Sequence, residues 1–148
     1  MPHFGLMDES SLGPVDALLM RTKLHVRCGR RRLREGKVSL GIVTLEDAVS
    51  CGMQWYFAKQ KTEDVLDIRD GENTNDDRTL LTILTRSGVL DGSFDYDGFN
   101  GLVEKALADE LNSFDYREML QGIETLLHQL GVLPFDESEL PPEDPSTP

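Results

Sequence analysis

The spacing of apolar residues is the feature that most restricts how this chain can fold. In its C-terminal third, apolar side chains recur every three or four positions in two separate stretches, and elsewhere no stretch shows a convincing alternation of apolar and polar residues. Spacing of this kind places side chains on one face of an α-helix, whereas a half-buried strand needs strict alternation. The two stretches are Phe99, Leu102, Val103, Ala106, Leu107 and Leu111, followed by Met119, Ile123, Leu126, Leu127 and Leu130. The pattern predicts an all-α protein.

Three further helices are expected before these two. Pro14 suits the first turn of a helix over residues 14–34, because its missing N–H is not needed there. A second helix covers some or all of 39–60, beginning near residue 39 or at a cap formed by Thr44. A short helix capped by Asn75 or Asp76 extends to about residue 87. The chain is therefore predicted to form a bundle of four to five helices.

The tetrapeptide Ser-Phe-Asp-Tyr occurs twice, at residues 93–96 and 113–116, each time just before one of the apolar stretches. An aspartate immediately before a helix accepts hydrogen bonds from the free N–H groups of the first turn. The phenylalanine before it stands five positions from an apolar residue, which is the spacing of a hydrophobic staple. We therefore interpret Asp95 and Asp115 as the N-caps of the last two helices.

A degenerate calcium site is the alternative interpretation of residues 87–104. The run resembles the second half of an EF-hand loop, in which Asp95 would be a ligand. Calcium needs about six or more oxygens, including a bidentate carboxylate at the end of the loop. Gly98 stands at that position in one register, and the other register lacks the first acid. Neither register supplies the full set, so no metal is expected.

Charge is strongly segregated along the chain. The whole sequence carries −12 at neutral pH, yet residues 21–37 hold eight of the fifteen Lys and Arg and one acid, so this segment carries +7 and the remainder −19. Basic residues gathered on one helix are typical of a surface that binds phosphates or an acidic partner. The candidate binding residues are Arg27, Arg30, Arg31 and Arg34, which lie mostly off the apolar face.

Three interpretations of this basic helix remain open. The first is RNA or nucleotide binding, which the anionic remainder of the chain disfavours because it repels polyanions. The second is neutralisation by the acidic segment 62–77 and by the acidic C-terminal tail, within one molecule or across a homodimer. The third is an acidic protein partner. The same arginines serve all three.

The second predicted helix carries the aromatic run Trp55, Tyr56 and Phe57. Aromatic side chains dominate protein cores and also the centres of interfaces. We expect a core position for the run, and we take Trp55 and Phe57 as the interface candidates if this helix faces a partner.

The C-terminal segment 134–148 differs in composition from the rest of the chain. It contains five of the seven prolines, five acids and no basic residue. Such a segment buries too little apolar surface to offset the entropy lost on ordering. We therefore expect a single helical domain over 1–133, followed by an acidic, proline-rich tail that is disordered or draped over the surface.

The sequence contains no recognisable catalytic set. Cys28 and Cys51 lack the spacing of a metal or redox motif, and the three histidines form no metal-binding pattern. No apolar run approaches the roughly 18 residues of a membrane span, and the N-terminal residues do not resemble a signal peptide. We expect a soluble, cytoplasmic, non-enzymatic interaction or regulatory protein, without a cofactor, that acts with a protein partner or as a homo-oligomer.

Three stretches of the chain, REGKVSLGIVTLEDAVSCGMQWYFA, DDRTLLTILTRSGVLDGSFDYDGFNGLVEKAL and LPFDESELPPEDP, resemble a family of small, acidic, uncharacterised bacterial proteins. That likeness covers most of the chain and implies no activity. The order of helices more loosely resembles the HEPN-type and nucleotidyltransferase-substrate-binding bundles, which implies association with RNA or nucleotides. The nuclease members carry an Arg and a His separated by four to six intervening residues in a late helix. Here Arg21 and His25 have three residues between them in the first helix, so the nuclease motif is not matched.

Overall fold

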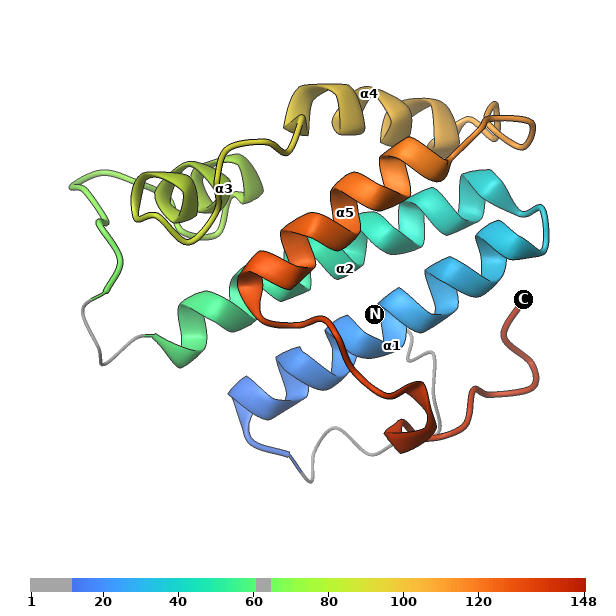
Figure 1. Ribbon diagram of the computed structural model, residues 1–148, viewed down its shortest axis with the longest axis horizontal. Helices are drawn as coiled ribbons and strands as arrows, with labels where there is room; N and C mark the ends of the chain where they lie inside the picture. The colour runs from blue at the N-terminus through green and yellow to red at the C-terminus, as the bar shows by residue number, and fades with distance from the viewer. Residues whose placement is uncertain (1–11, 61–64) are drawn as a thin grey trace.

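The computed structural model describes residues 12–60 and 65–148 of the chain, and all regular structure in these ranges is helical (Figure 1). The elements are α1 (Pro14–Arg34), α2 (Val38–Lys59), α3 (Asp77–Arg86), α4 (Tyr96–Leu107), α5 (Arg117–Leu130) and a short 3-10 turn, η2 (Glu137–Glu139). The prediction of an all-α bundle of four to five helices is therefore confirmed. Within the described residues, none of the helices is both long enough and apolar enough to cross a bilayer.

Helices α1 and α2 form an antiparallel hairpin (Figure 1). Gly36 closes α1 with φ of 82°, and its N–H donates to the carbonyl oxygen of Leu33 at 3.1 Å. A glycine accepts this left-handed conformation without the strain that a Cβ would bring. Helix α2 begins at Val38, so the later start at Thr44 does not occur. The Thr44 hydroxyl instead donates to the carbonyl oxygen of Leu40 within the helix, at 2.7 Å.

The two helices approach each other closely at two glycines. A Cβ atom at Gly29 of α1 would lie 2.7 Å from Cγ of Leu45, and one at Gly41 of α2 would lie 2.8 Å from Cδ2 of Leu33. Glycine weakens an isolated helix. Helix α1 nevertheless continues through Gly29, because the missing side chain lets α2 pack against it.

Helix α2 is the centre of the bundle and contacts α1, α3, α4 and α5 (Figure 1). Its residues are buried on most sides, which agrees with a helix that is apolar over much of its girth. The largest fully buried apolar side chains come from four helices: Leu24 of α1, Ile42, Leu45 and Met53 of α2, Leu80, Ile83 and Leu84 of α3, and Ile123, Leu126, Leu127 and Leu130 of α5.

The first Ser-Phe-Asp-Tyr copy starts α4 as predicted. Oδ1 of Asp95 accepts a hydrogen bond from the N–H of Gly98 at 3.0 Å. The rings of Phe94 and Phe99 meet edge to face with their centroids 5.6 Å apart, which is the contact of a hydrophobic staple. Asp95 as N-cap is therefore confirmed.

The second copy starts its helix differently. Helix α5 begins at Arg117 with Tyr116 at the N-cap position, so the prediction that Asp115 is the N-cap is wrong by one residue. The Asp115 carboxylate accepts from the backbone N–H of Arg117 at 3.2 Å and from its guanidinium at 2.9 and 2.6 Å. The guanidinium holds this carboxylate beside its own backbone. The first copy has Asp97 at the equivalent position, which offers no such donor.

After α5 ends at Gly131, the chain turns back and residues 134–148 run beside α1 (Figure 1). Apart from η2, this tail has no regular structure. Its least exposed residues are half-buried rather than buried: Phe135, Leu140, Pro141, Glu143, Asp144 and Thr147. The tail therefore lies on the surface of the bundle and is not part of its core.

Candidate interaction surface

Three arginines of α1 are less exposed than a solvent-facing helix would leave them. The side chains of Arg27, Arg31 and Arg30 keep 12%, 21% and 22% of their accessible surface. Two of the three, Arg27 and Arg31, lie one helical turn apart and face the tail. We call the surface formed by Lys23, Arg27, Arg31 and Arg32 the α1 basic face.

Glu143 of the tail lies between two arginines of the α1 basic face. Its Oε2 accepts a hydrogen bond from Nε of Arg31 at 2.8 Å, and its Oε1 lies 3.6 Å from Nε of Arg27. Nη1 of Arg27 also donates to the carbonyl oxygen of Pro141 at 2.7 Å. Hydrogen bonds to an ionised carboxylate are stronger than those between neutral groups. The arginines therefore hold both the backbone and a side chain of the tail.

All three guanidinium nitrogens of Arg31 donate hydrogen bonds. Besides Glu143, it donates to Oε1 of Glu35 at 2.9 Å and to the carbonyl oxygen of Pro148 at 3.0 Å. Burial works against the charged guanidinium, but the charge of Glu143 and its hydrogen bond outweigh this and raise the pKa of Arg31 above its ordinary value. The tail contact thus stabilises the charged form of Arg31.

Arg32 connects the tail to the interior of the helical hairpin. It is 4% exposed, and its Nη1 donates to Oγ1 of Thr44 on α2 at 2.6 Å. Its Nε donates to the carbonyl oxygen of Pro148 at 3.0 Å. The sequence places Arg32 among the arginines of this helix, but its position in the helix alone does not show that it faces α2.

The two remaining candidates do not face the tail. Arg30 forms an ion pair with Glu124 of α5. Arg34, the last residue of α1, is exposed and makes no ion pair with any residue in the described ranges. The structure therefore brings Arg27 and Arg31 together and sets Arg30 and Arg34 apart.

The acidic segment 62–77 was a second candidate for neutralising the arginines of α1. In its described part, from residue 65, the acids pair elsewhere: Oδ2 of Asp67 lies 3.2 Å from Nε of Arg86, and Oε1 of Glu72 lies 2.6 Å from Nη2 of the same residue. This part of the segment is therefore tied to α3, and the tail supplies the acid that meets Arg27 and Arg31.

The aromatic candidates of α2 have separate surroundings. Trp55 is 8% exposed and belongs to the core, with Nζ of Lys59 lying 4.4 Å from the ring centroid. Phe57 is half-buried and lines a shallow hollow of about 700 Å3 together with Leu66 and Ile68. The burial of Trp55 leaves little of its ring for a partner, which corrects its place among the interface candidates.

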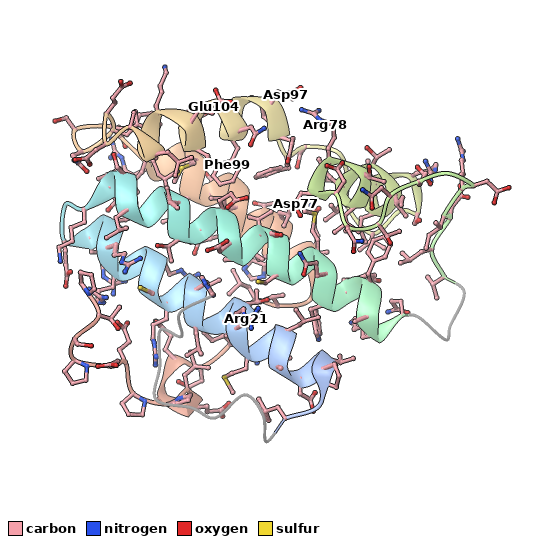
Figure 2. The ribbon with its side chains drawn as sticks, turned by 180° about the vertical axis from the view of Figure 1, so that it is seen from behind. Arg21, Asp77, Arg78, Asp97, Phe99 and Glu104 are labelled. Carbon is pink, nitrogen blue, oxygen red and sulfur yellow. The ribbon has the colours of Figure 1, made fainter. Side chains whose placement is uncertain are left out.

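The carboxylates of the proposed calcium segment are engaged locally. Oδ1 of Asp91 accepts from the N–H and hydroxyl of Ser93, at 2.9 and 2.6 Å, while Asp95 caps α4. Asp97 pairs with Arg78, and Figure 2 shows the two side by side where α3 and α4 begin. Across residues 12–60 and 65–148, no group of three His, Cys, Asp or Glu side chains is arranged to hold a metal ion.

The two cysteine thiols of the interior are not activated. Cys28 and Cys51 are buried free thiols. Burial raises the pKa of both, that of Cys51 to about 11. A thiol reacts through its thiolate, so neither is an activated nucleophile.

Comparisons of the chain with protein-family models, with curated proteins and with solved structures give no match. The function is therefore inferred from the contacts within the protein, in particular from those between the α1 basic face and the tail.

Proposed function

We propose that this protein is a non-enzymatic interaction or regulatory module whose contact surface is the basic helix α1, and that its partner is an acidic protein. One observation carries the proposal: the carboxylate of Glu143 lies between Arg27 and Arg31, accepting a hydrogen bond from Arg31 and forming an ion pair with Arg27. Complementary charge gives a partner both orientation and a faster approach. A surface that holds one acidic segment has the charge and donors to hold another.

Arginine suits this role better than lysine would. Its planar guanidinium presents five N–H donors in a fixed geometry, so one side chain can hold a carboxylate and a carbonyl oxygen together. Arg27 does so with Glu143 and Pro141. Arg34 extends the same helix with an exposed cation beyond the tail contacts. A partner larger than the tail would therefore meet additional positive charge at the end of α1.

Binding of RNA or nucleotides through the same arginines is the competing interpretation. Phosphate oxygens accept the same hydrogen bonds as carboxylates. The net charge of −12 and the acids of the tail on the α1 basic face oppose it, because anions repel a polyanion.

A cytoplasmic location accords with the two free thiols, since disulfides form in oxidising compartments.

The test is quantitative capture of partners from an extract of the native host. The chain carrying Arg31→Glu and Arg34→Glu is compared with the wild type and with a control carrying Lys105→Glu and Arg117→Glu. The control makes the same change of charge at two exposed residues on other helices. The extract is used with and without RNase treatment. Circular dichroism checks that each variant is folded.

Proteins captured by the wild type and the control, lost from the α1 variant and insensitive to RNase support the proposal. Equal capture by all three proteins would remove the α1 surface from it. Capture that RNase abolishes would establish the nucleic-acid interpretation in its place.

A further inference from the structure

The contacts between the tail and α1 occur in the same order along both segments. Phe135 lies near the start of the tail and Pro148 at its far end, and the partners on α1 advance in step. The matched pairs are Lys23 with Phe135, Arg27 with Pro141, Arg31 with Glu143, and Arg32 with Pro148. The tail therefore runs in the same direction as α1, with each contact residue of the tail matched to a particular residue of the helix.

The tail and the α1 basic face are complementary in hydrogen-bonding type as well as in charge. Proline has no backbone N–H, so at Pro141 and Pro148 the main chain offers only a carbonyl oxygen, and an ionised glutamate also only accepts. Arginine side chains only donate. At these contacts the tail thus presents acceptors to a surface that presents donors.

The tail is held to the surface by few groups. Its residues are half-buried or exposed, and Arg27, Arg31 and Arg32 donate its hydrogen bonds to α1 in the described part of the chain. Segments with little buried apolar surface open locally at low cost, well below the free energy of global unfolding. The tail can therefore leave the α1 basic face while the helical core stays folded.

We infer that the α1 basic face is a recognition site for extended, acidic, proline-containing peptide segments, and that residues 134–148 occupy it as an intramolecular ligand that a partner segment must displace. This inference rests on the proposed function, because it names the chemistry of the partner. The determinants are a proline carbonyl bound to Arg27 and, two residues later, a glutamate bound by Arg27 and Arg31. Consecutive prolines such as Pro141 and Pro142 favour an extended chain, which reduces the entropy lost on binding.

The covalent link between the tail and the bundle determines how strongly the tail competes with a free segment for the α1 basic face. A ligand joined to its site by a short chain acts at an effective concentration on the order of millimolar. A free segment of the same sequence therefore binds with an apparent affinity reduced by the fraction of molecules whose site is open. Weakening the contact of the tail should increase that fraction and strengthen binding of the free segment.

The experiment uses the full chain and a fluorescein-labelled synthetic peptide with the sequence of residues 134–148 as the probe. Fluorescence anisotropy measures its binding to the wild type and to the chain carrying Glu143→Gln. Loss of the charge-assisted contact should tighten probe binding roughly tenfold. Glu139→Gln is the matched control, because Glu139 is an exposed acid of the same tail whose side chain forms no hydrogen bond or ion pair with the described residues of α1. It should leave the affinity unchanged.

Two further comparisons test where and how the probe binds. Arg31→Gln introduced together with Glu143→Gln should remove the gain, and a probe with Gln at position 143 should bind the Glu143→Gln chain roughly tenfold more weakly than the unaltered probe. Equal binding to the wild type and the Glu143→Gln chain, or a gain that survives Arg31→Gln, would overturn the inference.

The molecular mass of the wild type in solution tests the intramolecular assignment. A monomer is expected. A dimer that the probe dissociates would instead place the tail of a second copy on the α1 basic face.

This outcome is separable from that of the proposed function. If probe binding behaves as expected but host proteins are captured equally by all variants, the face holds only the chain's own tail. If host proteins depend on Arg31 but the probe does not bind the Glu143→Gln chain, the partner uses the helix without resembling the tail.

Discussion

Gly29 of α1 and Leu45 of α2 leave no space for a methyl group between them: a Cβ at Gly29 would lie 2.7 Å from Cγ and 2.8 Å from Cδ2 of Leu45. Leu45 is fully buried, so its side chain cannot move away into solvent. This contact sets how closely the two helices of the hairpin approach. It also sets where the opposite face of α1 lies, which carries the arginines that hold the tail.

Gly29→Ala should destabilise the protein even though alanine favours a helix. The gain in helix propensity of about 1 kcal/mol is opposed by an overpacking cost of about 1–3 kcal/mol, so we expect a net loss of up to about 2 kcal/mol. The measurement is the free energy of unfolding in urea. Gly122→Ala in α5 is the control, because a Cβ there meets nothing within 4 Å, and it should be neutral or stabilising. Equal stability of the two variants would show that α1 and α2 can separate without cost.

Thr44→Val should destabilise the helical hairpin through Arg32. Oγ1 of Thr44 accepts from Nη1 of Arg32 at 2.6 Å, and both side chains are buried. Loss of an acceptor for a buried charged donor costs about 1–3 kcal/mol. Thr82→Val makes the same change at an exposed position of α3 and should cost much less. If urea denaturation shows equal losses for the two variants, the Arg32 contact does not contribute to stability.

The two Ser-Phe-Asp-Tyr copies should respond differently to loss of their aspartates. Asp95→Ala removes the acceptor for Gly98 N–H and should lower the free energy of unfolding by about 1 kcal/mol, as for other N-caps. Asp115→Ala should cost less, because Asp115 lies outside the cap position and its main partner is the exposed Arg117. Thermal denaturation of the two variants in the same buffer compares them directly. A larger loss for Asp115→Ala would contradict the assignment of Tyr116 as the N-cap.

Stability should fall as the pH drops below about 6.5 because of His25. The side chain is 1% exposed, its Nδ1–H donates to the carbonyl oxygen of Arg21 at 2.7 Å, and burial lowers the pKa of His25 below 6.5 despite Asp47 nearby. The unfolded chain then binds a proton more readily than the folded one. The contribution is complete above the unfolded pKa and is lost as the pH falls toward the folded pKa.

Urea midpoints at about pH 7.5 and about pH 6 measure this effect, over a range above the ordinary titration of carboxylates. His25→Gln should reduce the difference between the two midpoints. His128→Gln, at an exposed histidine of α5, should preserve it. An unchanged difference in His25→Gln would assign the pH dependence to other groups.

Neither cysteine should react in the folded protein. Burial raises the pKa of Cys28 and of Cys51, the latter to about 11, so little thiolate is present near neutral pH. Ellman's reagent should therefore detect no fast thiol in the native state and both thiols after unfolding in urea. A thiol that reacts rapidly in the native protein would show that the hairpin opens locally at that cysteine.

The sequence by itself determined the features that depend on neighbours within a few residues. The extent of α1 from Pro14 to Arg34 and the Asp95 cap with its Phe94–Phe99 staple follow from local spacing, because capping and periodicity act over one or two turns. At Asp115 the same local rule missed the N-cap by one residue. There the guanidinium of Arg117 competed with the backbone for the carboxylate.

Only the tertiary structure decided which charges meet. Charge segregation in the sequence indicated that acids would approach the arginines of α1, but it did not separate the segment 62–77 from the tail. Arg31 and Glu143 are 112 residues apart, and their contact depends on how α5 packs on α2 and so on where the chain leaves the bundle. The close approach at Gly29 and the burial of Arg32 against Thr44 have the same origin. Spacing along a helix shows which residues share a face, whereas the packing of the other segments decides what that face meets.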